Sequence, residues 1–130
     1  MYTQLFPILT TPDLERALHF YRDLLGAAVT YSFPGPDGRP AYVGLERGAS
    51  HLGLGQDPTA AGADRRAISL WVYATDCDAA VARLRADGVP ILEEPADQPW
   101  GERVARARDP DGNVVIVGAR ATGAPADAAG

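Results

Sequence analysis

The chain has 130 residues, of which 46% are hydrophobic, which suffices for one compact domain with a proper core and leaves no room for a second. Its 17 acidic and 12 basic side chains give a formal net charge of −5, which opposes nonspecific attraction to nucleic acid. The first residues carry no basic stretch followed by a long apolar run, and no window reaches the roughly 18 apolar residues needed to cross a bilayer. We therefore expect a soluble, cytoplasmic protein with neither nucleic-acid nor membrane partners.

The first half of the chain predicts a strand, a helix and three further strands. Residues 5–10 are apolar and short enough for a strand, and Asp13 marks a helix start with Thr11 or Pro12 near the cap. Apolar side chains then recur at helical spacing as far as a left-handed stop at Gly26. They are Leu14, Leu18, Tyr21 and Leu25. Strands are predicted at 27–33, 41–46 and 51–55, the first two joined by a Pro-Asp-Gly turn.

The second half repeats this order after an aperiodic linker at 56–65. Its helix starts at Asp76, as the first starts at Asp13, and it stops at Gly88. Strands are predicted at 67–73, 90–93, 102–108 and 113–118, with a loop at 98–101. The two modules cover about 4–55 and 66–118 of a single domain at 1–118, and the small and acidic residues of 119–130 predict a disordered tail.

Two strings of residues carry a family resemblance. Phe20-Tyr21-Arg22-Asp23-Leu24-Leu25-Gly26 follows the first helix start, and Asp109-Pro110-Asp111-Gly112-Asn113 precedes the last strand. In this order, inside a duplicated unit, they resemble the vicinal oxygen chelate superfamily of glyoxalases, extradiol dioxygenases and bleomycin resistance proteins. The resemblance implies an α+β fold in which two tandem βαβββ modules form a cupped mixed sheet, with the helices outside and a ligand cavity inside.

The same resemblance implies four positions for metal ligands, and this chain fills them poorly. They fall on Phe6, His51, Ser69 and Ile116. A divalent catalytic site needs at least three donors, and Phe and Ile donate nothing. We therefore expect no metal and no cofactor. Two alternatives remain for a residual site beside His51: a shifted register would bring in the oxygen donor of Gln4, and Glu46 would be recruited from a neighbouring strand unless it is a solvated strand end.

In place of a metal site, strand alternation predicts a pocket for an organic ligand, because residues two apart on a strand face the same side of a sheet. If Ser69 faces the cavity, so do Trp71 and Tyr73, while Phe6 and Ile116 add apolar walls. The alternative for Trp71 and Phe6 is simple core packing. The set suits a flat organic ligand.

Trp100 stands between Pro99 and Gly101 in a loop, where a large aromatic either covers a ligand or caps a core. Its surroundings resemble the corresponding stretch of bleomycin resistance proteins, which implies drug binding without conversion and a homodimer with shared crevices. Val104 departs from that pattern, since drug-binding relatives frequently carry an acid after the Arg, here Arg103. The acids Glu93, Glu94 and Asp97 are either an attraction for a basic ligand or a solvated edge.

Other chemistry finds no support in the sequence. Cys77 lies just inside a helix start and reads as a small, partly buried residue, and no Ser-His-Asp set or phosphate-binding loop is present. We predict no catalytic residues and a protein that binds and sequesters a planar aromatic antibiotic or natural product. The alternative is a divergent glyoxalase-like lyase, isomerase or dioxygenase with a non-standard metal site or acid/base catalysis through His51. The predicted ligand-binding residues are Trp100, Trp71, Phe6, Ser69, His51, Tyr73, Phe33, Arg103 and Ile116.

Overall fold

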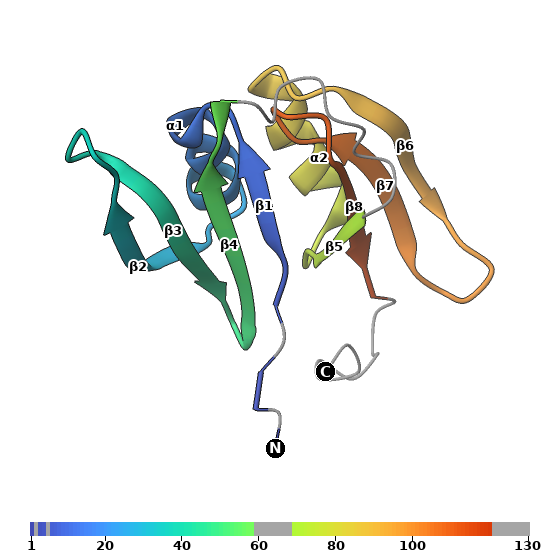
Figure 1. Ribbon diagram of the computed structural model, residues 1–130. Coiled ribbons are helices and arrows are strands. Elements are labelled where there is room, and N and C mark those ends of the chain that lie inside the picture. Colours follow the sequence, from blue (N-terminus) through green and yellow to red (C-terminus); the bar gives the residue numbers. More distant parts are fainter. Residues whose placement is uncertain (2, 5, 59–68, 121–130) are drawn as a thin grey trace. The chain divides into compact units, whose positions relative to one another are not determined.

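The computed structural model describes residues 1, 3–4, 6–58 and 69–120, and the chain divides into two compact units at residues 63 and 64 (Figure 1). This division falls inside the predicted linker at 56–65. The greater part of that linker and of the predicted tail at 119–130 lies outside the described residues.

Both units run in the order strand, helix, strand, strand, strand, which confirms the predicted tandem βαβββ modules. The first unit holds β1 (Ile8–Thr11), α1 (Leu14–Leu18), the π-helix η1 (His19–Leu24), β2 (Ala28–Pro34), β3 (Pro40–Arg47) and β4 (Ser50–Gln56). The second holds β5 (Ser69–Tyr73), α2 (Cys77–Ala86), β6 (Ile91–Asp97), β7 (Arg103–Arg108) and β8 (Val114–Ala119).

Each unit forms its own four-stranded mixed sheet. The strand orders are β1-β4-β3-β2 and β5-β8-β7-β6. The first and last strands of each unit pair in parallel and the other neighbours pair antiparallel. The predicted α+β class is therefore confirmed, with two four-stranded sheets in place of one.

The helix starts differ from the prediction in the capping residue. Asp13, and not Thr11 or Pro12, is the N-cap of α1, because its carboxylate accepts a hydrogen bond from the backbone N–H of Arg16 at 3.1 Å. Thr11 ends β1 and is buried, and its hydroxyl bonds the backbone of Asp13. Asp76 caps α2 in the same way through the N–H of Ala79. Both predicted helix stops are confirmed, since Gly26 and Gly88 have φ of 81° and 83°.

One face of each sheet packs against the helix of the same unit (Figure 1). Strand alternation sends the apolar side chains to this face and forms the core. In the first unit it holds Leu9, Leu14, Ala17, Leu18, Val43, Leu45 and Leu54, and in the second Cys77, Val81, Leu84, Ala105, Ala107, Val115 and Val117. The opposite face of each sheet is called the helix-free face below.

Two strand predictions are corrected at their ends. The ladder of β1 begins at Ile8 and not at residue 5. β6 continues to Asp97, although Pro95 lacks an N–H, because it is an edge strand whose register with β7 shifts between Glu93 and Ala96.

In the part of the chain that the structure describes, no helix is long and apolar enough to cross a membrane. Cys77 is buried, and burial raises the pKa of its thiol. It fits the structural role predicted for it.

Candidate ligand-binding site

The helix-free face of the first unit carries a pocket of about 300 Å³. The pocket is lined by Gln4, Phe6, Thr30, Tyr31, Tyr42, Gly44, Leu45, His51 and Leu52. Two predicted ligand residues, Phe6 and His51, meet here with ring centroids 6.2 Å apart. Gln4 lies on the same side, as the alternation of residues before β1 predicted.

His51 is held by Glu46. The two residues are directly opposite each other in the ladder of β3 and β4, and the Nδ1 of His51 lies 3.0 Å from the Oε1 of Glu46. Both side chains are partly exposed. Of the two oxygen donors considered from the sequence, Glu46 contacts the imidazole, and Gln4 shares the pocket with it.

Tyr31 and Tyr42 complete the aromatic lining and were not predicted. Their ring centroids are 6.1 Å apart and the ring planes are inclined at 62°, an edge-to-face arrangement. Tyr42 lies across Gly53 of β4, where a Cβ would meet its ring and Ile8. Phe33 lies two residues after Tyr31 on β2 and shares the helix-free face with it. Phe33 is 57% exposed and does not line the pocket. Strand alternation from Phe33 was the signal for Tyr31.

The helix-free face of the second unit carries a group of aromatic side chains. Ser69, Trp71 and Tyr73 alternate along β5, as predicted, and the Trp71 and Tyr73 rings are 5.6 Å apart. Trp71 lies over Gly118 of β8. Ile116 of β8 is the register partner of Trp71. It is buried, and its side chain therefore lies below the exposed aromatic rings of this face. Phe6 and Trp71, for which core packing was the alternative, are 39% and 42% exposed.

Glu102 joins Trp100 to this group. The indole N–H of Trp100 donates to the Oε1 of Glu102 at 2.6 Å, and the hydroxyl of Tyr73 donates to the same carboxylate, which raises the pKa of Tyr73. The guanidinium carbon of Arg120 lies 4.0 Å from the centre of the Tyr73 ring. Trp100 is 60% exposed at the tip of the β6–β7 hairpin, so it does not fill a core.

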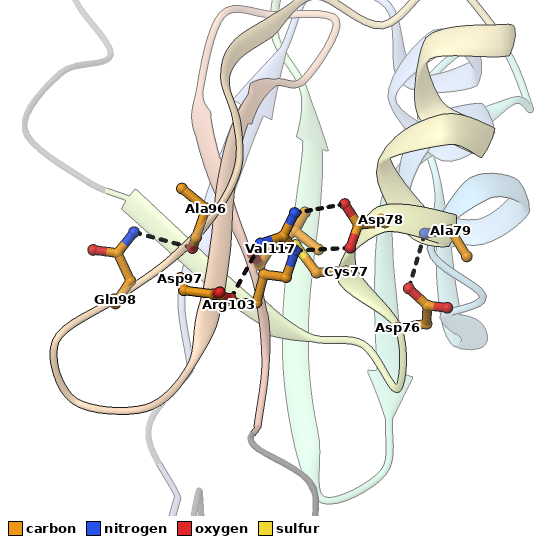
Figure 2. A network of polar contacts seen from close by, with 9 residues as sticks. All are labelled: Asp76, Cys77, Asp78, Ala79, Ala96, Asp97, Gln98, Arg103 and Val117. Carbon is orange, nitrogen blue, oxygen red and sulfur yellow. Dashed lines mark hydrogen bonds and ion pairs between the residues drawn. The ribbon is translucent and has the colours of Figure 1, made fainter.

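Arg103 points to the helix side of its sheet. Its Nε and Nη2 donate to both carboxylate oxygens of Asp78 in α2, at 2.7 and 3.1 Å, and its Nη1 donates to Asp97 in β6 at 3.1 Å (Figure 2). The two carboxylates raise the pKa of Arg103, and Arg103 lowers the pKa of Asp78. The guanidinium of Arg103 therefore connects the β6–β7 hairpin to α2. A role for Arg103 in ligand contact stays a prediction.

The three acids near the Trp100 loop each have a basic partner. Glu93 pairs with Arg106 at 3.4 Å, Glu94 with Arg85, and Asp97 with Arg103. The acidic stretch had two interpretations, an attraction for a basic ligand or a solvated edge. These contacts favour the solvated edge, because each acid is already paired with an arginine.

The donor set does not fit the metal site of the resembled superfamily. Of its four positions, Phe6 and Ile116 have no donor atom, and within 1, 3–4, 6–58 and 69–120 no three His, Cys, Asp or Glu side chains are grouped to hold an ion. The imidazole at the fourth-strand position faces one carboxylate, that of Glu46.

Comparison with known proteins gives one family. The model described as Glyoxalase/Bleomycin resistance protein/Dioxygenase superfamily matches residues 3–117. No curated protein matches the chain significantly.

Solved structures share the fold. A glyoxalase/bleomycin resistance protein/dioxygenase from Nocardioides is 25% identical, with a TM-score of 0.69 over 95% of this chain and 87% of that one. A lactoylglutathione lyase from Agrobacterium tumefaciens is 26% identical, with a TM-score of 0.66 over 91% and 94% of the two chains. The trypanothione-dependent glyoxalase I of Leishmania major is 25% identical, with a TM-score of 0.70 over 89% and 86%.

Proposed function

The chain belongs to the Glyoxalase/Bleomycin resistance protein/Dioxygenase superfamily, and on that premise we propose that it binds a planar aromatic small molecule without converting it. The ligand class is an aromatic antibiotic or a related natural product, and the role is sequestration.

One observation carries this proposal: exposed aromatic side chains gather on the helix-free face of each sheet. Tyr31 and Phe6 are 53% and 39% exposed in the first unit, and Trp71, Tyr73 and Trp100 are 41% to 60% exposed in the second. Water-exposed aromatic rings stabilise a fold little, while they gain about 0.5–1.5 kcal/mol each from stacking on a flat partner. Their concentration on the faces that no helix of the same unit covers supports ligand binding.

The missing donors support binding without conversion. Lewis-acid chemistry needs a metal held by several donor side chains, and Phe6 and Ile116 stand at two of the four positions that would provide them. Metal analysis of the purified protein tests this directly. Nickel, zinc, iron or manganese at one equivalent per chain would contradict the binding-only function.

The binding test is a titration with bleomycin and with a planar anthracycline, followed by calorimetry and by quenching of the two tryptophans, and a non-aromatic trisaccharide is the control. We expect at least one aromatic compound to bind with a micromolar dissociation constant, which corresponds to a binding free energy of about −8 kcal/mol. The sugar should not bind. The compound should be recovered unchanged after incubation. Absence of binding by every planar compound would overturn the proposal.

The contact between Glu46 and His51 favours a second candidate, a metal-free acid/base enzyme. A carboxylate that holds one imidazole nitrogen leaves the other for proton transfer to a bound substrate. Formation of lactoylglutathione by the wild type and its loss in His51→Phe would favour this candidate over sequestration, whereas equal background in both proteins would exclude this reaction.

We further propose that the protein works as a homodimer in the cytoplasm. Large apolar side chains such as Tyr31, Phe33 and Trp71 are exposed on the helix-free faces, and a second copy of the chain would cover part of them. Sedimentation at micromolar concentration should give about twice the chain mass of 13.7 kDa. A monomer at these concentrations would count against crevices shared between two chains.

A further inference from the structure

Part of the lining of the first-unit pocket is main chain. Gly44 of β3 lines the pocket, and in the register of the sheet it lies between Tyr31 of β2 and Gly53 of β4. Leu45 also lines the pocket although its side chain is buried in the core, so it contributes main-chain atoms. Because β3 pairs with a strand on each side, its peptide groups form hydrogen bonds within the sheet and turn their flat faces to the pocket.

Neither of the usual structural reasons explains a glycine at position 44. Gly44 does not have a positive φ, and among the described residues an added Cβ would meet only the Cβ of Tyr31, at 3.4 Å. Gly53 differs, because a Cβ there would meet the ring of Tyr42 and the side chain of Ile8. A glycine inside a strand otherwise marks a place where a ligand or another backbone approaches closely. The space above Gly44 is therefore suited to a ligand.

A β-bulge beside Gly44 turns further side chains to the same pocket. The register of β2 with β3 shifts between Val29 and Tyr31, which leaves Thr30 as an extra residue of β2. Thr30 and Tyr31 both line the pocket although they are consecutive in the chain, and the hydroxyl of Thr30 donates to the carbonyl oxygen of Gly44 at 3.5 Å. Bulges are common next to active sites, where they redirect side chains. The extra residue belongs to β2, so the bulge does not require a glycine in β3.

The lining favours an uncharged ligand. Among the described residues that line the pocket, none is Asp, Glu, Lys or Arg. The imidazole of His51 lies 3.0 Å from the carboxylate of Glu46, which compensates its charge when it is protonated. A charged group that leaves water without a partner of opposite charge loses far more free energy than a neutral ring does.

We infer that Gly44 is the specificity-determining residue of this pocket, because an uncharged, flat ring system lies there directly on the main chain of β3. Phe6, Tyr31 and Tyr42 supply aromatic walls around it. The inference rests on the proposed function and names its ligand class and the place of contact more closely.

The first test fills the space above Gly44, with the uncharged probe β-naphthamide titrated by calorimetry. Gly44→Val puts methyl groups where the ring would lie, so it should weaken binding about ten-fold or more. Gly55→Val is the matched control, because Gly55 lies on the same face of the sheet and does not line the pocket. Among the described residues nothing lies within 4 Å of a Cβ at Gly55, so this variant should bind like the wild type. Thermal melting checks both folds, and Gly44→Ala should weaken binding by a smaller factor if the valine variant does not fold.

The second test varies the charge of the probe at constant ring size. At neutral pH β-naphthalenesulfonate is an anion and β-naphthylmethylamine is a cation. Both should bind the wild type at least about five-fold more weakly than β-naphthamide, because the pocket offers neither of them a charged partner. Equal or tighter binding of either ion would overturn the inferred ligand class.

The third test places the ring by NMR of isotope-labelled protein. A ring that lies flat on a peptide group shifts the signal of the neighbouring amide proton through its ring current. β-Naphthamide should therefore give its largest shifts at the amides of Gly44 and Leu45. Largest shifts in the second unit would overturn the inference.

The outcomes separate the inference from the proposed function. Equal binding by Gly44→Val and the wild type, or equal weakening in Gly44→Val and Gly55→Val, would overturn the role of Gly44. A positive antibiotic titration would leave the proposed function standing in either case. Absence of binding by all three naphthalene probes would overturn the inferred ligand class and, together with failure of the antibiotic titration, the proposed function.

Discussion

The two units share one plan on their helix sides and differ on their helix-free faces. In both units the N-cap is an aspartate whose side chain accepts a hydrogen bond from the backbone N–H of the third residue after it. In both units the helical segment is followed by a glycine with positive φ. On the other face, the first unit pairs His51 with Glu46 among tyrosines. In the second unit, Trp100 and Tyr73 both donate to Glu102, and Trp71 lies beside Tyr73. The difference teaches that core packing constrains one side of the duplicated module and leaves the other to diverge.

Even shared features differ in burial. Each unit has a Pro-Asp-Gly turn, but Asp37 is exposed and its carboxylate accepts a hydrogen bond from the backbone N–H of Arg39 at 2.9 Å. Asp109, which precedes the second turn, is 4% exposed and accepts from two backbone amides and from the side-chain amide of Asn113 at 2.7 to 2.9 Å. The buried hydrogen bonds of Asp109 therefore stabilise the second turn, whereas the first turn is an exposed hairpin connection.

Removing these two carboxylates gives the largest expected contrast. Asp109→Ala leaves the amides of buried Asn113 without their acceptor, so we expect a loss of about 2–4 kcal/mol in the free energy of unfolding. Asp37→Ala should cost no more than about 0.5 kcal/mol. Urea denaturation of both variants measures the two values, and equal losses would contradict the distinction between the turns.

Filling the strand glycines is the next contrast. A Cβ at Gly118 would stand 2.7 Å from the Cζ2 of Trp71, and a Cβ at Gly53 would meet Tyr42 and Ile8. Each substitution by alanine should cost about 1–3 kcal/mol, because a ring must leave the sheet surface. Only Gly118→Ala should also change the tryptophan emission, since both tryptophans belong to the second unit.

Gly55→Ala is the matched control for both changes. It lies in β4 with nothing within 4 Å of the added Cβ, so its stability should stay within about 0.5 kcal/mol of the wild type. Losses of similar size in all three variants would point to strand backbone effects in place of ring displacement.

Trp100→Ala separates ligand contact from structural capping. An exposed indole at a hairpin tip should leave thermal melting nearly unchanged, while loss of a stacking partner should weaken binding of a planar ligand by roughly ten-fold to thirty-fold. Leu92→Ala removes a side chain of comparable exposure, 43%, and should change neither quantity. A collapse of melting with normal binding would make Trp100 a cap.

Glu102→Gln gives the smallest effect, seen in the titration of Tyr73. In the wild type the hydrogen bond to Glu102 raises the pKa of Tyr73 above its ordinary value, so the stability that this contact adds is full below about pH 10 and is lost as pH rises through the folded pKa. The variant should ionise Tyr73 at lower pH, seen as tyrosinate absorbance, with Tyr73→Phe to assign the signal. No change between wild type and variant would contradict the contact.

Local signals in the sequence determined the modules. Asp13 and Asp76 start helices and Gly26 and Gly88 end them because capping and positive φ depend on a few neighbouring residues. The pleat likewise determined that Ser69, Trp71 and Tyr73 share a face, and Phe6 was expected beside His51 only through the family resemblance. Ligand contact by all these residues stays a prediction.

Only the tertiary structure decided which polar groups meet. Glu46 reaches His51 through the register of β3 and β4, Arg103 turns toward Asp78 of a helix 25 residues earlier, and β6 continues past Pro95 because it is an edge strand. A register slip of one residue would send each of these side chains to the other face. Pairings of this kind depend on distant segments, so no local pattern in the sequence specifies them.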